Sequence, residues 1–313
     1  MEDFSNKITV VTGGAGFIGS HIVDALLARG GSVRVIDDLS TGKMENIAHI
    51  LDRIEFVKDT ILNTEVLAKV FAGADCIFHQ AAIPSVPKSI RDPLSSHNAN
   101  ATGSLNVLLA ARDAKVRRVI CAASSSYYGD TPTLPKDETM PPNPLSPYAL
   151  QKYVEEKYAT MFYKLYGLET VALRYFNIYG PRQDPHSEYS AVIPLFIKKM
   201  KAGQSPNING DGTASRGFTF IDDTVAANLL ASQAPGIAGE IFNISGTGQT
   251  SINELVSKIN AMLGASIEPS YGPERQGDIK HSYADISKAQ RMLGWKPAVS
   301  FEEGLKLTAE TIG

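Results

Sequence analysis

Short apolar runs alternate with longer amphipathic stretches along the first half of the chain. The runs predict buried strands, and the stretches between them predict helices. The predicted strands are 7–12, 32–36, 55–58, 75–79, 118–121 and 170–175. Because strands that alternate with helices are joined by right-handed crossovers, this pattern predicts an α/β fold with a doubly wound, parallel Rossmann sheet.

The second half of the chain is less regular, and glycines and prolines interrupt it at short intervals. We find no internal repeat or low-complexity tract, so we interpret it as a smaller α+β unit. The predicted domains are a Rossmann domain over 1–175, to which segments around 215–245 return, and a C-terminal substrate domain over 176–313. Long helices are predicted over 98–114 and 148–167, and a proline-rich surface loop over 135–147.

The composition is that of a globular protein, with 43% hydrophobic and 20% charged residues. A net charge of -3 gives no basic field for nucleic acid or an anionic membrane, so neither is expected as a partner. The two cysteines lie in apolar runs and are expected to be packing residues, and no spacing predicts a metal site. No signal sequence or membrane-length apolar run is recognised, so a cytoplasmic location is expected.

A glycine-rich motif, GGAGFIG over 13–19, follows the first predicted strand and opens an amphipathic helix. Glycines let the backbone turn tightly and approach a pyrophosphate, whose charge is stabilised by free N–H groups at a helix N-terminus. The motif therefore predicts a dinucleotide-binding loop. Its expected cofactor contacts are Gly13, Gly16, Phe17 and Ile18.

Acidic residues follow the second and third predicted strands. Asp37 lies where a carboxylate can hydrogen-bond the ribose hydroxyls of an adenosine and repel a 2′-phosphate, which favours NAD over NADP. Asp38 beside it is a second candidate contact; alternatively, either carboxylate only caps the following turn. Asp59, after the third strand, is expected to reach the adenine.

Three hydroxyl residues and a Tyr-x-x-x-Lys pair are the candidate catalytic groups. Ser124 ends the fifth predicted strand, and Tyr148 and Lys152 are four residues apart on a predicted helix. They therefore share one helix face, where an ammonium favours the ionised phenolate of its neighbour and makes the tyrosine a proton-transfer group. The pair alone is weak evidence, because this spacing is common on solvated helices.

Taken together, these motifs have the order found in the extended short-chain dehydrogenase/reductase family, which the chain resembles over essentially its whole length. The resemblance continues through 174–182 (RYFNIYGPR), 209–212 (NGDG), Arg216, 275–278 (RQGD) and 293–295 (LGW). The motifs are most similar to those of the nucleotide-sugar branch, and within it to UDP-hexose 4-epimerases.

The resemblance implies tightly bound NAD that is not consumed, a UDP-sugar substrate, and catalysis by Ser124, Tyr148 and Lys152. In such a site the tyrosine takes the O4 proton, the serine hydrogen-bonds O4, and the lysine favours the phenolate and holds the nicotinamide ribose. Further implied cofactor contacts are Thr60, Gln80, Ala81, Ala82, Asn100, Tyr148, Lys152 and Tyr175. Implied substrate contacts are Pro84, Ser85, Val86, Lys88, Ser124, Ser125, Ser126, Tyr148, Asn177, Ala191, Val192, Asn209, Arg216, Arg275, Asp278 and Ser282.

The serine run at 124–126 separates the activities found on this fold. Related dehydratases and UDP-glucuronate decarboxylases are similar but have an acidic residue there, whereas this chain has none, which favours epimerisation. A reductase, a dehydratase, a UDP-glucuronate-type epimerase and a non-catalytic NAD-sensing protein remain as alternatives.

The expected sugar and assembly follow from the same resemblance. Ser282 occupies a position where epimerases restricted to plain hexoses resemble one another in having a tyrosine, so room for a 2-acetamido group is implied. The expected substrates are UDP-GlcNAc and UDP-GalNAc, with UDP-glucose and UDP-galactose as further candidates. Leu109, Val154 and Met161 are expected to face outward in a homodimeric four-helix bundle, unless they pack internally.

Three departures from the family pattern bear on the site. Gly217 stands where relatives commonly have Asp, so a carboxylate contact is missing. Tyr127 stands where many relatives have a smaller residue, and we expect it to crowd the sugar pocket. Thr60 replaces the usual aliphatic residue, which puts its adenine contact in doubt.

Overall fold

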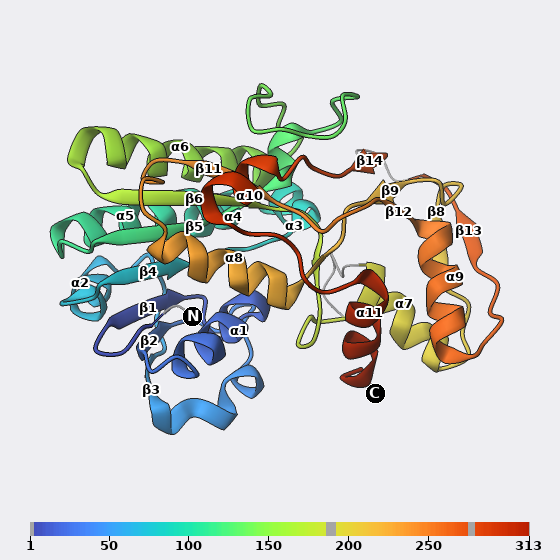
Figure 1. Ribbon diagram of the computed structural model, residues 1–313, viewed down its shortest axis with the longest axis horizontal. Coiled ribbons are helices and arrows are strands. Elements are labelled where there is room, and N and C mark those ends of the chain that lie inside the picture. Colours follow the sequence, from blue (N-terminus) through green and yellow to red (C-terminus); the bar gives the residue numbers. More distant parts are fainter. Residues whose placement is uncertain (1–2, 186–191, 275–278, 313) are drawn as a thin grey trace.

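Seven parallel strands form one central sheet in the order β11-β6-β5-β4-β1-β2-β3 (Figure 1). The computed structural model describes residues 3–185, 192–274 and 279–312. The sheet contains β1 (Ile8–Thr12), β2 (Ser32–Ile36), β3 (Ile54–Val57), β4 (Cys76–His79), β5 (Arg118–Ser124), β6 (Glu169–Tyr175) and β11 (Ile241–Ile244). The order reverses between β1 and β4, so the loops that follow these two strands flank the crevice where such sheets bind ligands.

Helices cover both faces of this sheet. On one face α1 (Phe17–Leu27) packs against α8 (Ile221–Gln233), and on the other α2 (Thr64–Phe71), α5 (Gly103–Asp113) and α6 (Pro147–Tyr166) form a layer (Figure 1). The doubly wound α/β fold predicted from the sequence is confirmed.

The strands are apolar without interruption because side chains alternate between two buried faces. Val11 and Phe78 belong to the hydrophobic core beneath α1 and α8. Val10 and Ile77, their neighbours in sequence, belong to the core beneath α2, α5 and α6. Both cysteines, Cys76 and Cys121, are buried in these cores, as expected.

Part of the second half of the chain joins the central sheet. β11 pairs with β6, α8 covers the sheet, and α10 (Ser287–Leu293) packs against β11. The remaining segments form a lobe of short elements beside the sheet, which Figure 1 shows at the right. It contains α7 (Val192–Lys201), α9 (Ile252–Leu263), α11 (Phe301–Glu310), β8 (Asn207–Asn209), β9 (Ser215–Arg216), β12 (Thr250–Ser251), β13 (Ser270–Gly272) and β14 (His281–Ser282).

Short elements connect these parts. β7 (Ile178–Tyr179) pairs in parallel with β10 (Thr219–Phe220) where the chain leaves and re-enters the sheet region. Between β4 and α5 lie α3 (Val86–Arg91) and α4 (Pro93–His97), followed by a π-helical turn over Asn98–Thr102. Two 3₁₀ segments, Met44–Asn46 and Ala48–Arg53, precede β3, and a third, Ser125–Tyr128, follows β5.

Apart from shifts of one residue, three parts of the chain differ from the sequence prediction. β5 extends to Ser124, because the small residues at 122–123 continue the ladder with β6. The helical stretch expected to begin at Asn98 begins at Pro93, where Asp92 caps the first turn. The loop over 135–147 is not wholly a surface loop, since buried Lys136 forms a β-bridge with Ala284.

No helix in 3–185, 192–274 or 279–312 is long and apolar enough to cross a membrane. The same ranges contain no cluster of three or more His, Cys, Asp or Glu side chains that could hold a metal ion.

Candidate active site

The glycine-rich turn after β1 brings the backbone against the loop that follows β4. Gly13 has φ +69°, and a Cβ there would lie 2.7 Å from the Ala81 backbone. A Cβ on Gly19 would lie 2.1 Å from the Gly13 carbonyl oxygen. No side chain caps α1 at Gly16, and its first turn has no acidic residue. This close-packed, uncapped helix N-terminus, at which Phe17 and Ile18 form the first turn, fits a dinucleotide pyrophosphate.

The carboxylate of Asp37 links the end of β2 to this turn. Its Oδ2 accepts a hydrogen bond from the Ala15 N–H (2.9 Å), and its Oδ1 accepts one from the Leu39 N–H (2.8 Å). Burial raises the pKa of Asp37, while these two N–H groups oppose the rise. Asp38 is exposed and accepts a bond from the Ser40 N–H, so both carboxylates make the local caps considered as alternatives. Their ribose contacts stay predictions.

The carboxylate of Asp59, the third acidic candidate, is also hydrogen-bonded to residues close to it in sequence. Asp59 accepts hydrogen bonds from the Thr60 N–H (2.7 Å) and from the Asn63 side-chain amide (3.2 Å). The Thr60 hydroxyl accepts from the Leu62 N–H. These bonds form the turn that precedes α2, and the expected adenine contacts of Asp59 and Thr60 stay predictions.

Ser124 is the last residue of β5, at the C-terminal edge of the sheet, where its ladder partner is Tyr175. Its Oγ accepts hydrogen bonds from the Ser126 N–H (3.2 Å) and the Ser126 hydroxyl (2.9 Å). The structure shows no hydrogen bond from the Ser124 hydroxyl to a described residue outside this turn. The Ser124 oxygen is therefore held by its own turn, with half-buried Ser125 and Ser126 beside it.

Helix α6 presents the predicted Tyr-x-x-x-Lys pair to the same edge. Ser146 caps the helix by accepting from the Ala149 N–H (3.1 Å), and Pro147 occupies its first turn. The Tyr148 N–H donates to the Ser89 hydroxyl (3.1 Å), which ties the start of α6 to α3. Tyr148 is half-buried and Lys152 is 4% exposed, so the phenol lies nearer to solvent than the ammonium.

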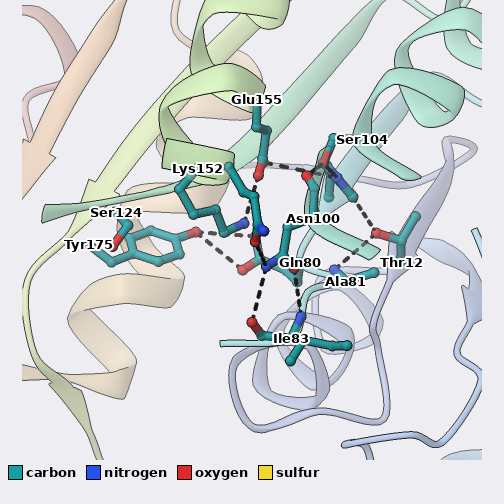
Figure 2. Close-up of polar contacts among 12 residues, drawn as sticks. Thr12, Gln80, Ala81, Ile83, Asn100, Ser104, Ser124, Lys152, Glu155 and Tyr175 are labelled. Atoms are coloured by element: carbon teal, nitrogen blue, oxygen red, sulfur yellow. Dashed lines mark hydrogen bonds and ion pairs between the residues drawn. The ribbon is translucent and has the colours of Figure 1, made fainter. Parts of the chain in front are cut away.

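Lys152 forms an ion pair with a carboxylate that the sequence reasoning missed. Its Nζ donates to Glu155 Oε2 at 2.7 Å, and Glu155 is 0% exposed (Figure 2). Burial opposes the charge of Lys152, but attraction to Glu155 and Tyr148 outweighs it and the pKa of Lys152 is raised. Burial also raises the pKa of Glu155, and Lys152 opposes that rise.

A buried histidine lies beside this ion pair. His79 Nδ1 is 2.8 Å from the Thr12 hydroxyl, and its Nε2 is 2.8 Å from the Ser104 hydroxyl. Ser104 donates onward to the Asn100 carbonyl oxygen (2.7 Å), so the Ser104 oxygen accepts from a protonated Nε2. Burial lowers the pKa of His79 to about 3, with a further contribution from Lys152. His79 is therefore neutral and holds β1, β4 and α5 together.

Several predicted cofactor residues contact one another at the β4 end of the crevice (Figure 2). The Gln80 side-chain amide donates to the Tyr175 hydroxyl (3.1 Å), which donates to Asn228 on α8 (3.0 Å). Ala81 donates to the Thr12 hydroxyl, and Ala82 follows it half-buried. Burial raises the pKa of Tyr175, which keeps it a neutral donor.

Asn100 is fully buried and bonded to protein. Its Oδ1 accepts from the Ile83 N–H (2.7 Å), and its Nδ2 donates to the Ile83 carbonyl oxygen and to Gln151 (3.0 Å). It thereby fixes the loop after β4 against α6 (Figure 2). The structure supports Asn100 as a residue that positions this loop, and its expected direct cofactor contact stays a prediction.

The predicted substrate residues of the second lobe meet on a small ladder. β9 pairs with β14 so that Arg216 and Ser282 are partners and lie on the same face. Arg216 Nη1 donates to the carbonyl oxygens of Ser215 (2.9 Å) and Lys280 (3.0 Å). Two residues 66 positions apart in sequence are therefore brought together, as a common substrate site requires.

Asn177 reaches this ladder from the end of β6. Its side-chain amide donates to the Gly217 carbonyl oxygen (3.2 Å), and its φ of +44° is one that few non-glycine residues adopt. A glycine at position 217 has a steric explanation. A Cβ there would lie 2.7 Å from the Ser245 hydroxyl and 3.1 Å from Tyr283 Cβ. A carboxylate at 217 would require Tyr283 and Ser245 to move, which accounts for this departure from the family pattern.

The other predicted substrate positions are spread over three segments. Ser85 caps α3 by accepting from the Lys88 N–H (3.2 Å), with exposed Pro84 before it and half-buried Val86 after it. Val192 begins α7 and Asn209 ends β8, away from the Arg216 ladder in sequence and sheet pairing. Ala191, Arg275 and Asp278 lie outside the described residues.

The expected effect of Tyr127 on the sugar pocket stays a prediction, and the structure shows how this side chain itself packs. The Tyr127 ring lies 3.6 Å from the Arg174 guanidinium, and its hydroxyl donates to the Met140 carbonyl oxygen (3.0 Å). Arg174 in turn forms a bidentate ion pair with Glu156 (2.6 and 2.9 Å). Tyr127 is 5% exposed and anchors the 3₁₀ segment Ser125–Tyr128, to which it belongs, in the protein interior.

Sequence reasoning also missed Ser89 and Asn228, which bond to predicted site residues. No local motif marks them. Glu155 did carry a signal, since it lies three residues after Lys152 and seven after Tyr148, on the inward face of an amphipathic helix where a carboxylate is unusual.

The comparisons with known proteins identify the family. A model of the NAD dependent epimerase/dehydratase family matches residues 9–245. A UDP-glucose 4-epimerase from Mycolicibacterium smegmatis is 42% identical over 307 residues, covering 96% of this chain and 97% of its own. Relatives with lower identity are named UDP-glucuronate 4-epimerase (34%) and UDP-glucuronic acid decarboxylase (31%).

Two solved structures are similar over nearly the whole chain. The UDP-glucose 4-epimerase from Thermotoga maritima with UDP-glucose is 40% identical, with a TM-score of 0.93 and coverage of 97% and 98% of the two chains. The UDP-N-acetylglucosamine 4-epimerase from Methanobrevibacter ruminantium with UDP-N-acetylmuramic acid is 41% identical, with a TM-score of 0.94 and coverage of 99% and 98%.

Proposed function

This chain belongs to the NAD dependent epimerase/dehydratase family, and from that membership we propose that it interconverts UDP-GlcNAc and UDP-GalNAc by epimerisation at C4. It is an enzyme of the UDP-sugar 4-epimerase group, and its cofactor is NAD. UDP-glucose and UDP-galactose are proposed as further substrates.

One observation carries the choice of reaction. Ser124 ends β5, Tyr148 and Lys152 lie one turn apart on α6, which packs against β5, and the turn that follows β5 contains serines but no carboxylate. Elimination of water requires an added acid and base at that turn. Without them, oxidation at C4 is reversed, and reversal onto the other face is epimerisation.

Each of the three residues has a defined task in this proposal. The Tyr148 phenolate takes the O4 proton, and the Ser124 hydroxyl donates to the same oxygen. The charged Lys152 favours the phenolate and reaches the nicotinamide ribose. When bound, NAD supplies hydride acceptance and return at C4. The 4-keto sugar then rotates so that its opposite face meets the cofactor, and Tyr148 returns its proton to O4.

The substrate must be held tightly at its diphosphate and loosely at its sugar, because the sugar has to present both faces. Arg216 is proposed to bind the diphosphate, since guanidinium groups match phosphate oxygens in geometry. Asn177, Asn209 and Val192, together with Ala191, Arg275 and Asp278, are proposed as the other contacts of this half.

Ser282 supports the choice of an N-acetylated sugar. It is the ladder partner of Arg216, and we propose that its small side chain borders the sugar beside the proposed diphosphate site. A hydroxymethyl group leaves room there for a 2-acetamido substituent. Pro84, Ser85, Val86 and Lys88 are proposed to line the opposite side of the sugar.

A coupled assay of four substrates tests the proposal: UDP-GlcNAc, UDP-GalNAc, UDP-glucose and UDP-glucuronate, without added NAD. We expect turnover of the N-acetylated pair with no net change in nicotinamide absorbance. Turnover of UDP-glucose alone would contradict the proposed sugar. Turnover that depends on added NAD and raises nicotinamide absorbance with product would indicate a dehydrogenase, and turnover that depends on added NADH and lowers it would indicate a reductase. Loss of water or of carbon dioxide would indicate a dehydratase or decarboxylase.

We also propose a homodimer that pairs α5 and α6 of two copies. Met161 is 48% exposed on α6 and supports this proposal, whereas Val154 is half-buried and Leu109 packs partly against the core beneath α2, α5 and α6. Light scattering at micromolar concentration checks this, and a monomer would reject it. The cytoplasmic location stays a prediction from the sequence.

A further inference from the structure

Helix α6 carries three ionisable side chains in one line. Tyr148, Lys152 and Glu155 are separated by four and three residues, so they follow the same helix face over two turns. Tyr148 is half-buried, Lys152 is 4% exposed and Glu155 is 0% exposed. The line therefore leads from the proposed reaction site to a carboxylate at its buried end.

Glu155 has few bonding partners apart from the lysine. Its Oε2 accepts from Lys152 Nζ at 2.7 Å. Its Oε1 lies 4.0 Å from His79 Nε2 and has no hydrogen-bond partner among the described residues. A fully buried carboxylate is costly unless it is paired, so the ammonium, with a smaller contribution from the nearby Ser104 hydroxyl, keeps Glu155 ionised at this place.

We propose that Glu155 is a positioning residue for the catalytic lysine, whose carboxylate fixes Lys152 Nζ beneath Tyr148 and keeps the ammonium charged throughout the reaction cycle. The proposal rests on the function proposed above for Tyr148 and Lys152. It adds a residue that touches neither substrate nor cofactor but acts through the lysine.

The cycle makes such a carboxylate useful. While Tyr148 is a phenolate, the buried ammonium has an anion on the reaction side. Once Tyr148 has taken the O4 proton, the phenol is neutral and that anion is lost. Glu155 is then the anion that remains beside Lys152, so the lysine stays protonated. Tyr148 meanwhile holds the proton that must return to O4.

The other ionisable groups around the pair do not provide this compensation. His79 faces the ion pair from β4 and is neutral. Cys121 on β5 and Tyr175 on β6 also face the pair, and burial raises the pKa of each, which keeps both neutral. On α6 itself, the Glu156 carboxylate is engaged by Arg174 at 2.6 Å. Glu155 is therefore the carboxylate placed to set the charge of Lys152.

The direct test follows the protonation of Lys152 itself. Carbon–nitrogen correlation spectra of isotope-labelled lysine are recorded against pH, and the Lys152 signal is assigned by its loss in Lys152→Met. In the wild-type protein we expect an ammonium signal through the whole pH range in which the protein stays folded. In Glu155→Gln the transition to the amine should move down by about one pH unit or more and so appear within that pH range.

Kinetics supply the second readout. In the wild-type enzyme kcat should not fall on the alkaline side before unfolding begins, whereas in Glu155→Gln it should fall with the lysine transition. Glu155→Asp keeps the charge one methylene further away and should restore most of the alkaline activity. A purely structural role would lower activity equally at every pH.

Glu156→Gln is the matched control, because it removes a neighbouring buried carboxylate from the same helix. It should lower thermal stability without moving the Lys152 transition. An ammonium signal that persists through the whole folded pH range in Glu155→Gln, or a transition to the amine that appears equally in Glu156→Gln, would overturn the proposal. If Glu155→Gln does not fold, Glu155→Asp must show a smaller shift in the same direction. Because the spectra require no substrate, failure to find UDP-hexose turnover would refute the proposed function and leave this test intact.

Discussion

The polar side chains at the edge of the central sheet and those of the second lobe are held in different ways. Lys152, Glu155 and His79 are at most 4% exposed and belong to a long helix and a central strand. Arg216 and Ser282 belong to strands of two residues each, and the Arg216 side chain is bonded to carbonyl oxygens near its own strand. The first region is a fixed frame for proton transfer, whereas the second is assembled from short pieces.

This difference matches the two tasks of the proposed reaction. Proton transfer requires donor and acceptor atoms to be placed within hydrogen-bond reach, which a packed helix and sheet provide. Binding a nucleotide while a sugar turns requires firm contacts at the diphosphate and few elsewhere. The predictions that follow test whether changes in the two regions have separable effects.

The largest effect should come from the fixed frame. Tyr148→Phe removes the phenolic oxygen and should lower kcat by about 10²- to 10⁴-fold, because proton transfer loses its base. Affinity for the UDP-sugar, measured by calorimetry, should change little, since the diphosphate contacts remain. A loss of affinity as large as the loss of kcat would contradict the separation of the two regions.

The opposite pattern is expected in the second lobe. Arg216→Ala should weaken binding of the UDP-sugar by about 10- to 100-fold, as expected for loss of charge-assisted hydrogen bonds to phosphate. kcat at saturating substrate should be less affected. Arg216→Lys should recover only part of the affinity, because an ammonium lacks the guanidinium fork. Equal affinities of Arg216→Ala and the wild-type protein for the UDP-sugar would show that Arg216 does not bind the diphosphate.

Sugar choice should depend on Ser282 and not on the catalytic residues. Ser282→Tyr should lower kcat/KM for UDP-GlcNAc by about tenfold or more through steric exclusion of the acetamido group. Its kcat/KM for UDP-glucose should stay near the wild-type value, which serves as the internal control. Parallel losses for both sugars would indicate a general disturbance of the β9–β14 ladder.

The smallest effect concerns stability and pH in the fixed frame. His79 has an ordinary pKa of 6.5 and a folded pKa of about 3, because burial disfavours its charged form. Its contribution to stability is therefore complete above pH 6.5 and is lost as the pH falls towards 3. Within this window each pH unit should lower the free energy of unfolding by about 1.4 kcal/mol. Denaturant titrations of His79→Gln should show a weaker acid dependence, and an unchanged slope would contradict the assignment of a neutral histidine.

Most of the sheet and the local parts of the site followed from the sequence. Strand positions, the turn over 13–19 and the Tyr148–Lys152 pair are set by short-range patterns, because periodicity and glycine content act within a few residues. The expected position of Ser124 at a strand end was right for the same reason. β5 was predicted too short because its last residues are small and less apolar, and only pairing with β6 extends the strand.

Tertiary structure decided the contacts that join distant segments. The sequence did not reveal that Ser282 pairs with Arg216, that Gly217 packs against Tyr283, or that Tyr127 packs against Arg174. Nor did the sequence identify Glu155 as the partner of Lys152, although the two residues are only three positions apart. Whether a carboxylate on a helix meets water or a buried ammonium depends on what packs over that face, and this is determined by the whole fold and not by local spacing.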